Sequence, residues 1–175
     1  MDAEKLVKHM AWANQEIISQ VMNMPNEALD AYVVNPEWTV REIARHIASS
    51  ATWYGWRLLD KSAWSESDHV SWKSKLDATE IPPATSKDIA ALLNKLSDAD
   101  EVLLEAARKP EGEVLREVDG KMIIRARSTI ISQAIHHATE HRAQLVSALE
   151  ARGFTSINLD DCDLWAYCDK HGEGF

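Results

Sequence analysis

Apolar side chains recur every three or four positions in four long segments of this chain, which is the spacing of one face of an α-helix. The first segment shows it most clearly, with Leu6, Met10, Ala13, Ile17 and Val21 on a single face. We therefore predict four helices, over about residues 3–24, 40–61, 86–109 and 126–152.

Residues at the ends of these segments support the predicted helix boundaries. Pro25 follows the first helix, and Gly153 follows the fourth, where a left-handed C-cap favours glycine. Thr39 precedes the second helix and Glu42 comes three residues later. This spacing is typical of a capping box, in which each side chain binds the other residue's backbone N–H. We therefore predict that Thr39 caps the second helix.

The connections complete the predicted fold. Residues 62–84 join the second and third helices, and a connection of this length in a compact domain is usually functional or a crossover. Alternating residues flank Asp119-Gly120, which is a strong hairpin signal. The apolar run Leu-Trp-Ala-Tyr in the tail should pack against the bundle. The prediction is one all-α domain over residues 1–175: a four-helix bundle with a long crossover between helices two and three and a small β-hairpin between helices three and four.

The composition limits the kinds of binding partner and the cellular compartment that we expect for this protein. The 175 residues are 45% hydrophobic, enough for one sizeable core, and carry a formal net charge of −9. An acidic chain lacks the electrostatic footprint of a nucleic-acid-binding protein. No apolar run reaches membrane-spanning length, and the two cysteines, Cys162 and Cys168, are too few for a disulfide framework. We expect a cytoplasmic protein that binds neither nucleic acid nor membrane.

Three histidines fall on core-facing positions of two predicted helices. His137 and His141 are four residues apart on one helix, so their rings share a face, and His46 lies on the second helix. Three ring nitrogens could form a metal site with open positions, whereas a closed structural zinc site normally has four protein ligands. The alternative is three core histidines, each satisfied by a carbonyl or hydroxyl. Because unpaired buried polar groups are costly, the three histidines must either share polar partners or bind a ligand such as a metal ion.

The residues around this pair are weaker candidates. His136 and Glu140 each precede one of the pair and so face about 100° away from it, which excludes the metalloprotease arrangement. Arg142 is expected to pair with a surface carboxylate rather than to hold a substrate anion. Five of the seven tryptophans lie within residues 38–72, which indicates the wall of a pocket or an interface.

Four blocks of the sequence carry a family resemblance. In chain order they are L-V-K-H-M-A-W-A-N, W-T-V-R-E-I-A-R-H-I-A, H-A-T-E-H-R-A-Q-L and L-D-D-C-D-L-W-A-Y. Together they resemble the DinB-like metal-binding four-helix bundles over nearly the whole chain. One departure is Ala143, where the family often has glycine. Alanine also permits close helix packing.

The resemblance implies that His46, His137 and His141 bind a divalent metal ion, often zinc or nickel, and that the protein forms a homodimer. Some relatives are S-transferases or isomerases that use a low-molecular-weight thiol. Three neutral histidine ligands add no negative charge, so the ion keeps its full positive charge. This charge lowers the pKa of a bound water or thiol. We expect a metal-dependent enzyme that acts on a small molecule, as a thiol-dependent S-transferase or a hydrolase. The alternative is a non-catalytic stress-response protein in which the metal is structural or sensory.

Two further expectations follow from this chemistry. The chain's own cysteines lie in the tail, so an external thiol is the better nucleophile. The aromatic stretch from Trp53 to Trp72 is expected to line an apolar substrate site next to the metal.

Overall fold

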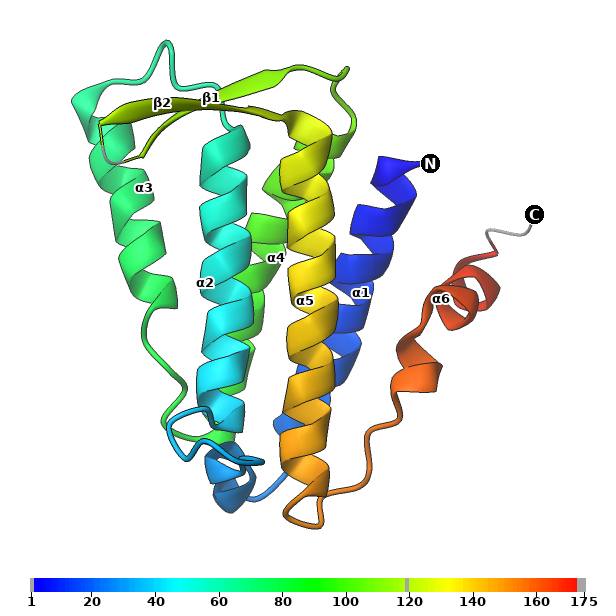
Figure 1. Cartoon of the computed structure of the whole chain (residues 1–175). Coiled ribbons are helices and arrows are strands. Elements are labelled where there is room, and N and C mark those ends of the chain that lie inside the picture. Colours follow the sequence, from blue (N-terminus) through cyan, green and yellow to red (C-terminus); the bar gives the residue numbers. More distant parts are fainter. Residues whose placement is uncertain (1, 119, 173–175) are drawn as a thin grey trace.

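Four long helices lie side by side in the computed structural model, which describes residues 2–118 and 120–172 (Figure 1). They are α1 (Ala3–Val21), α2 (Val40–Leu58), α4 (Ile89–Ala107) and α5 (Arg127–Glu150). The shorter α3 (Glu66–Thr79) lies between α2 and α4, and α6 (Leu164–His171) follows α5 in the tail. Short 3-10 turns cover Asn26–Asp30, Ser86–Asp88 and Leu159–Cys162. Strands β1 (Glu113–Val118) and β2 (Lys121–Ala126) pair antiparallel. The predicted helical fold with a small hairpin is confirmed. Asp119 of the predicted turn lies outside the described residues.

In the four-helix bundle, α1 lies diagonally opposite α2, and α4 lies diagonally opposite α5. Helices α1 and α2 each pack against both α4 and α5. In Figure 1, α1 and α5 run downward while α2 and α4 run upward, so the chain must return along the bundle between α2 and α4. Helix α3 makes this return beside α2. The predicted crossover is therefore present, and most of it is helical.

Apolar faces of all four long helices meet in one core. Ile17, Ile43, Leu96, Leu103 and Leu145 are at most 1% exposed. Burial of a side chain of this size contributes roughly 1.5–3 kcal/mol. The hairpin covers the end of the bundle where α2 ends and α5 begins, and Val114 of β1 packs against the core there (Figure 1).

Two local features differ from the sequence prediction. Residues 62–84 were predicted only as a long connection, but most of them form helix α3, of which only Leu76 and Thr79 are buried. The predicted capping box at Thr39 is wrong. No hydrogen bond reaches the buried Thr39 hydroxyl from any described residue, and Glu42 instead accepts a hydrogen bond from Arg45.

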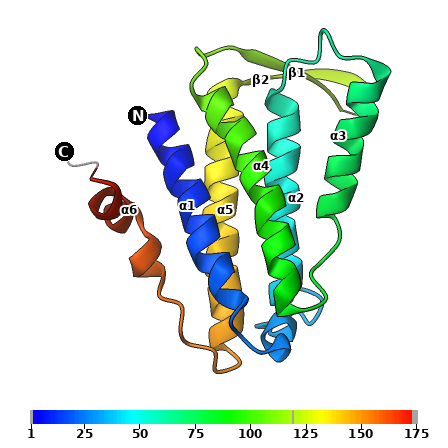
Figure 2. The same ribbon diagram turned by 180° about the vertical axis from the view of Figure 1, so that it is seen from behind.

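The tail packs on α1, as predicted. From the opposite side (Figure 2), α6 lies beside α1 at one edge of the bundle and α3 lies beside α2 at the other. Tyr167 is buried, its ring centroid 5.5 Å from that of Trp12. The His9 ring bonds the Cys162 carbonyl oxygen at 3.0 Å. No described helix is long and apolar enough to cross a bilayer.

Candidate metal centre

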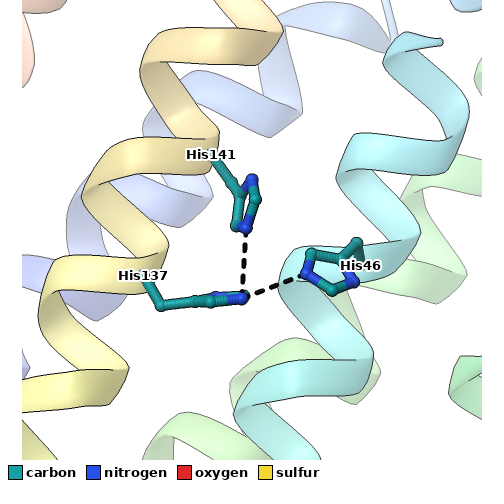
Figure 3. A group of neighbouring side chains, drawn as sticks. All are labelled: His46, His137 and His141. Carbon is teal, nitrogen blue, oxygen red and sulfur yellow. Dashed lines mark hydrogen bonds between the residues drawn. The ribbon is translucent and has the colours of Figure 1, made fainter. Parts of the chain in front are cut away.

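The structure brings His46, His137 and His141 together between α2 and α5 (Figure 3). Nε2 of His137 lies 3.0 Å from Nε2 of His46 and 3.1 Å from Nε2 of His141. All three potential ligand atoms lie within 4.8 Å of one another. Among the described residues this is the one group of three or more histidine, cysteine or acidic side chains close enough to hold a metal ion.

These separations fit the spacing of ligands on a metal ion. Zinc–nitrogen bonds of about 2.0–2.1 Å with angles of roughly 90–110° place neighbouring ligand nitrogens about 2.9–3.4 Å apart. The two Nε2–Nε2 distances from His137, 3.0 and 3.1 Å, fall within this range. The widest of the three separations, up to 4.8 Å, exceeds it and would shorten as the rings close on one ion. The three residues could therefore hold one ion with small side-chain adjustments.

Gln144 and Trp38 determine which nitrogen of His141 faces the site. Oε1 of Gln144 accepts a hydrogen bond from the Trp38 indole N–H at 2.9 Å, and Nδ1 of His141 lies 2.8 Å from the same oxygen. Because an indole N–H can only donate, the amide must present its oxygen, and Nδ1 of His141 must therefore carry a proton. In the neutral ring this leaves the Nε2 lone pair directed toward His137. A hydrogen bond at the other ring nitrogen is the usual support of a metal-binding histidine.

The site favours neutral imidazoles. Burial, together with the neighbouring His141 and His46 rings, lowers the pKa of His137 to about 4. Burial is also the main reason that the pKa of His46 is lowered, followed by its proximity to His141 and Arg45. Both rings are therefore neutral at pH 7, each with one ring nitrogen free to accept, which is the form that binds metal.

Trp38 and Tyr54 enclose the three rings. The Trp38 indole packs edge-on against His46 and His141, with ring centroids 5.2 and 5.6 Å away. On the other side, the Tyr54 ring lies 5.7 Å from that of His137. His136 and Glu140 are exposed on α5 and are not part of this group.

Arg142 lies in the core, so the expected pairing with a surface carboxylate is wrong. The residue is 5% exposed, and its guanidinium donates to Oδ1 of Asn14 at 2.8 Å and to the Thr139 hydroxyl at 3.1 Å. It also faces the buried Asp100 of α4. One turn of α5 therefore presents His141 to the triad and Arg142 to α1, because consecutive helix residues point about 100° apart.

A pocket of about 620 Å³ adjoins the triad at Tyr54. Trp53, Tyr54 and Trp56 of α2 form one wall, and Ile130 and Gln133 of α5 form another. This volume is within the range of small-molecule sites, about 300–1,000 Å³. Two tryptophans of the predicted aromatic stretch thus line a pocket, whereas Trp64 and Trp72 lie outside it.

The family of the chain is clear at this point. A family model described as "DinB family" matches residues 1–167. The chain belongs to the DinB family. No curated protein and no solved structure matches it significantly.

Sequence reasoning missed several residues that shape this DinB site. Gln144 follows His141 by three positions, which places both on one helix face, so the H-R-A-Q spacing could have identified it. Trp38 was counted among the tryptophans expected at a pocket or interface, but its hydrogen bond to Gln144 was not predicted. Tyr54 carried no such signal, because its contact with α5 joins segments far apart in the sequence.

Proposed function

We propose that this protein is a divalent-metal-dependent enzyme that acts on a small molecule, with His46, His137 and His141 as the metal ligands. The proposal rests on one observation above all. Nε2 of His137 lies at hydrogen-bonding distance from Nε2 of both His46 and His141, and protons alone do not satisfy the three nitrogens.

The ring protons of the three neutral histidines cannot satisfy all three facing nitrogens. His141 keeps its proton on Nδ1 for Gln144, so its Nε2 can only accept. A proton on His137 Nε2 would have to serve both His141 and His46, which lie 3.1 and 3.0 Å away. A proton on His46 Nε2 instead would leave the lone pairs of His137 and His141 facing each other. A single cation satisfies all three lone pairs at once.

Zinc or nickel fits three imidazole ligands, and a divalent ion bound there would lower the pKa of a coordinated water or thiol, supplying a hydrolase or an S-transferase with its nucleophile. The chain's own residues hold the ligands and the substrate. Gln144 and Trp38 keep the His141 ring oriented, and Tyr54 links the triad to the pocket. Cys162 is buried and Cys168 lies on α6, away from the triad, which favours a low-molecular-weight thiol as cosubstrate.

Metal content tests the ligand assignment. Purified protein should contain about one divalent ion per chain by elemental analysis, and alanine at His46, His137 or His141 should lower this content sharply. His136→Ala is the matched control, because His136 lies on the same helix beside His137 and is exposed. Loss of metal from His136→Ala with retention in His137→Ala would contradict the assignment.

Chelation separates catalysis from the alternative, a non-catalytic protein in which the metal is structural or sensory. A screen for thiol transfer and hydrolysis should detect activity that chelation removes and metal restores. The melting temperature should fall only modestly on chelation, because the core of the bundle is apolar and does not depend on the site. A large fall without detectable activity would favour the structural role.

We also propose a cytoplasmic homodimer. The family supports the assembly, and the two unpaired cysteines fit a reducing compartment. Leu115, Met122 and Ile124 are 51–65% exposed on the outer face of the hairpin and could contribute to such an interface. Sedimentation should give a dimer at micromolar concentration, and a monomer there would refute the assembly.

A further inference from the structure

We propose that the pocket beside the triad selects a small molecule that carries an anionic group on an apolar, preferably aromatic, body. The orientation of this molecule toward the metal rests on the proposed function, whereas its binding does not. The observation that leads to it is the charge of the pocket lining.

Four cationic side chains line the pocket: Arg57 from the last turn of α2, Lys61 from the segment that follows α2, Arg116 from β1 and Arg125 from β2. None of the lining residues is acidic. In a chain with a net charge of −9, such a concentration of positive charge runs against the composition. A cationic lining without acidic residues indicates an anionic ligand.

The two hairpin arginines are directed to the same side. Side chains alternate along a strand, so Arg116 lies on the same face as Val114, which packs against the core. Arg125 is paired directly with Val114 and so shares that face. Both arginines therefore extend over the pocket toward α2, while Leu115 lies on the outer face of β1.

Three of these charges are not neutralised within the described chain. Arg57, Arg116 and Arg125 have no carboxylate of a described residue within 4.0 Å. The N–H at Nε of Arg57 is buried and has no hydrogen-bond acceptor among the described residues. Burial, followed by the like charge of Arg116, lowers the Arg57 pKa. Two guanidiniums close together without an anion between them leave a site that a ligand anion would complete.

Lys61 plays a different part. Its ammonium donates to the Trp56 and Leu59 carbonyl oxygens at 2.6 and 3.2 Å and lies 4.5 Å from the centre of the Trp56 ring. Burial lowers the pKa of Lys61, and the charge of Asp60 opposes this shift without cancelling it. The Asp60 carboxylate accepts a hydrogen bond from the Ser62 backbone N–H. Lys61 thus holds the Trp56 side of the pocket and adds positive charge to it.

The dimensions of the site suggest how such a molecule lies. Thr129, at the hairpin end of the pocket, and His137 are eight residues apart on α5, which corresponds to roughly 12 Å along the helix. The anionic group would bind the guanidiniums, the apolar body would pack on Trp53 and Tyr54, and the opposite end would reach the triad. A carboxylate, sulfonate or phosphate would satisfy the arginines equally well.

Two fluorescent probes that differ only in charge test the selection. 8-Anilinonaphthalene-1-sulfonate carries a sulfonate, and N-phenyl-1-naphthylamine is the same ring system without it. The native protein should bind the sulfonate at least tenfold more tightly than the neutral probe at low ionic strength. The double variant Arg116→Gln/Arg125→Gln should bring this ratio close to one and leave the affinity for the neutral probe within about twofold.

Two further variants test whether the preference for the sulfonate probe arises in the pocket. Lys121→Gln removes one positive charge from an exposed position on the same hairpin, outside the pocket lining, and should preserve the ratio. Thr129→Trp, at an exposed lining position, should block the pocket and weaken both probes at least tenfold. Equal affinity of the native protein for both probes would overturn the proposal, as would an unchanged ratio in the arginine variant or unimpaired binding to Thr129→Trp.

His137→Ala distinguishes this inference from the proposed function. It should lose metal and still prefer the sulfonate. A native protein that prefers the sulfonate but contains no metal would refute the metal-dependent function alone. A metal-containing protein with no preference would refute the pocket assignment alone.

Discussion

Replacing Asp100 by asparagine should stabilise the protein at alkaline pH and have little effect at pH 4. Asp100 is 4% exposed in the core, and neither carboxylate oxygen accepts a hydrogen bond from the described residues. Burial raises its pKa from 3.8 to about 7, and the Asn14 amide and the Arg142 guanidinium oppose this rise without cancelling it. The folded protein therefore keeps a proton that the unfolded chain releases.

The sign and size of the effect follow from these two pKa values. Below pH 3.8 both states hold the proton, so Asp100 does not affect the free energy of unfolding. Between pH 3.8 and 7 the folded state binds more protons, so this free energy falls as the pH rises. Above pH 7 the cost reaches its full value, about 4 kcal/mol at 1.36 kcal/mol for each pKa unit.

Urea unfolding followed by circular dichroism from pH 4 to pH 8.5, in the presence of a chelator, measures this directly. The advantage of Asp100→Asn over the native protein should grow from near zero to about 4 kcal/mol. The histidines titrate in both proteins, so their contribution cancels in the difference. Asp98→Asn, at an exposed position on the same helix, should show no such trend. A difference between native protein and Asp100→Asn that stays constant with pH would refute the reasoning.

Three further predictions concern the ligand support, the core and the tail. Gln144→Leu should lower metal affinity about 10–100-fold in chelator competition, whereas Gln144→Glu, which keeps an acceptor, should lose less; equal losses would contradict the assigned role. Leu103→Ala should reduce the free energy of unfolding by about 2–5 kcal/mol, and the exposed Ile81→Ala by far less; similar losses would contradict the burial. Tyr167→Ala should release α6 from α1 and accelerate proteolysis after Gly153; an unchanged cleavage rate would show that other contacts hold the tail.

The long helices and the histidine positions were predictable from local patterns. The apolar period of three to four residues directly reflects burial of one helix face, and it placed His46, His137 and His141 on the inner faces of two helices. Helix α3 was not predictable in this way, because a helix that buries only Leu76 and Thr79 has no apolar stripe. Its signal was a capping box between Ser65 and Asp68.

Side-chain partners were less predictable than elements. The Thr39-Glu42 spacing matched a capping box, yet Glu42 pairs with Arg45, an alternative that the sequence pattern does not distinguish. Arg142 is charged, which favoured the surface, but Asn14 of another helix supplies its acceptor. The cationic pocket lining depends on the hairpin folding over α2, which brings Arg116 near Arg57. Contacts between segments this far apart leave no periodicity in the sequence.

The packing connects three of the four family blocks to one another. Within one turn of α5, His141 points to the triad and Gln144, on the same helix face, reaches Trp38 of the second block, whereas Arg142 points to Asn14 of the first block. The orientation of a single imidazole thus depends on α1, on the segment before α2 and on α5 itself. A change at Asn14 or Trp38 would reach the site through these hydrogen bonds, although neither residue would touch a metal ion. The first three blocks therefore meet at or beside the same site, although they lie far apart along the chain.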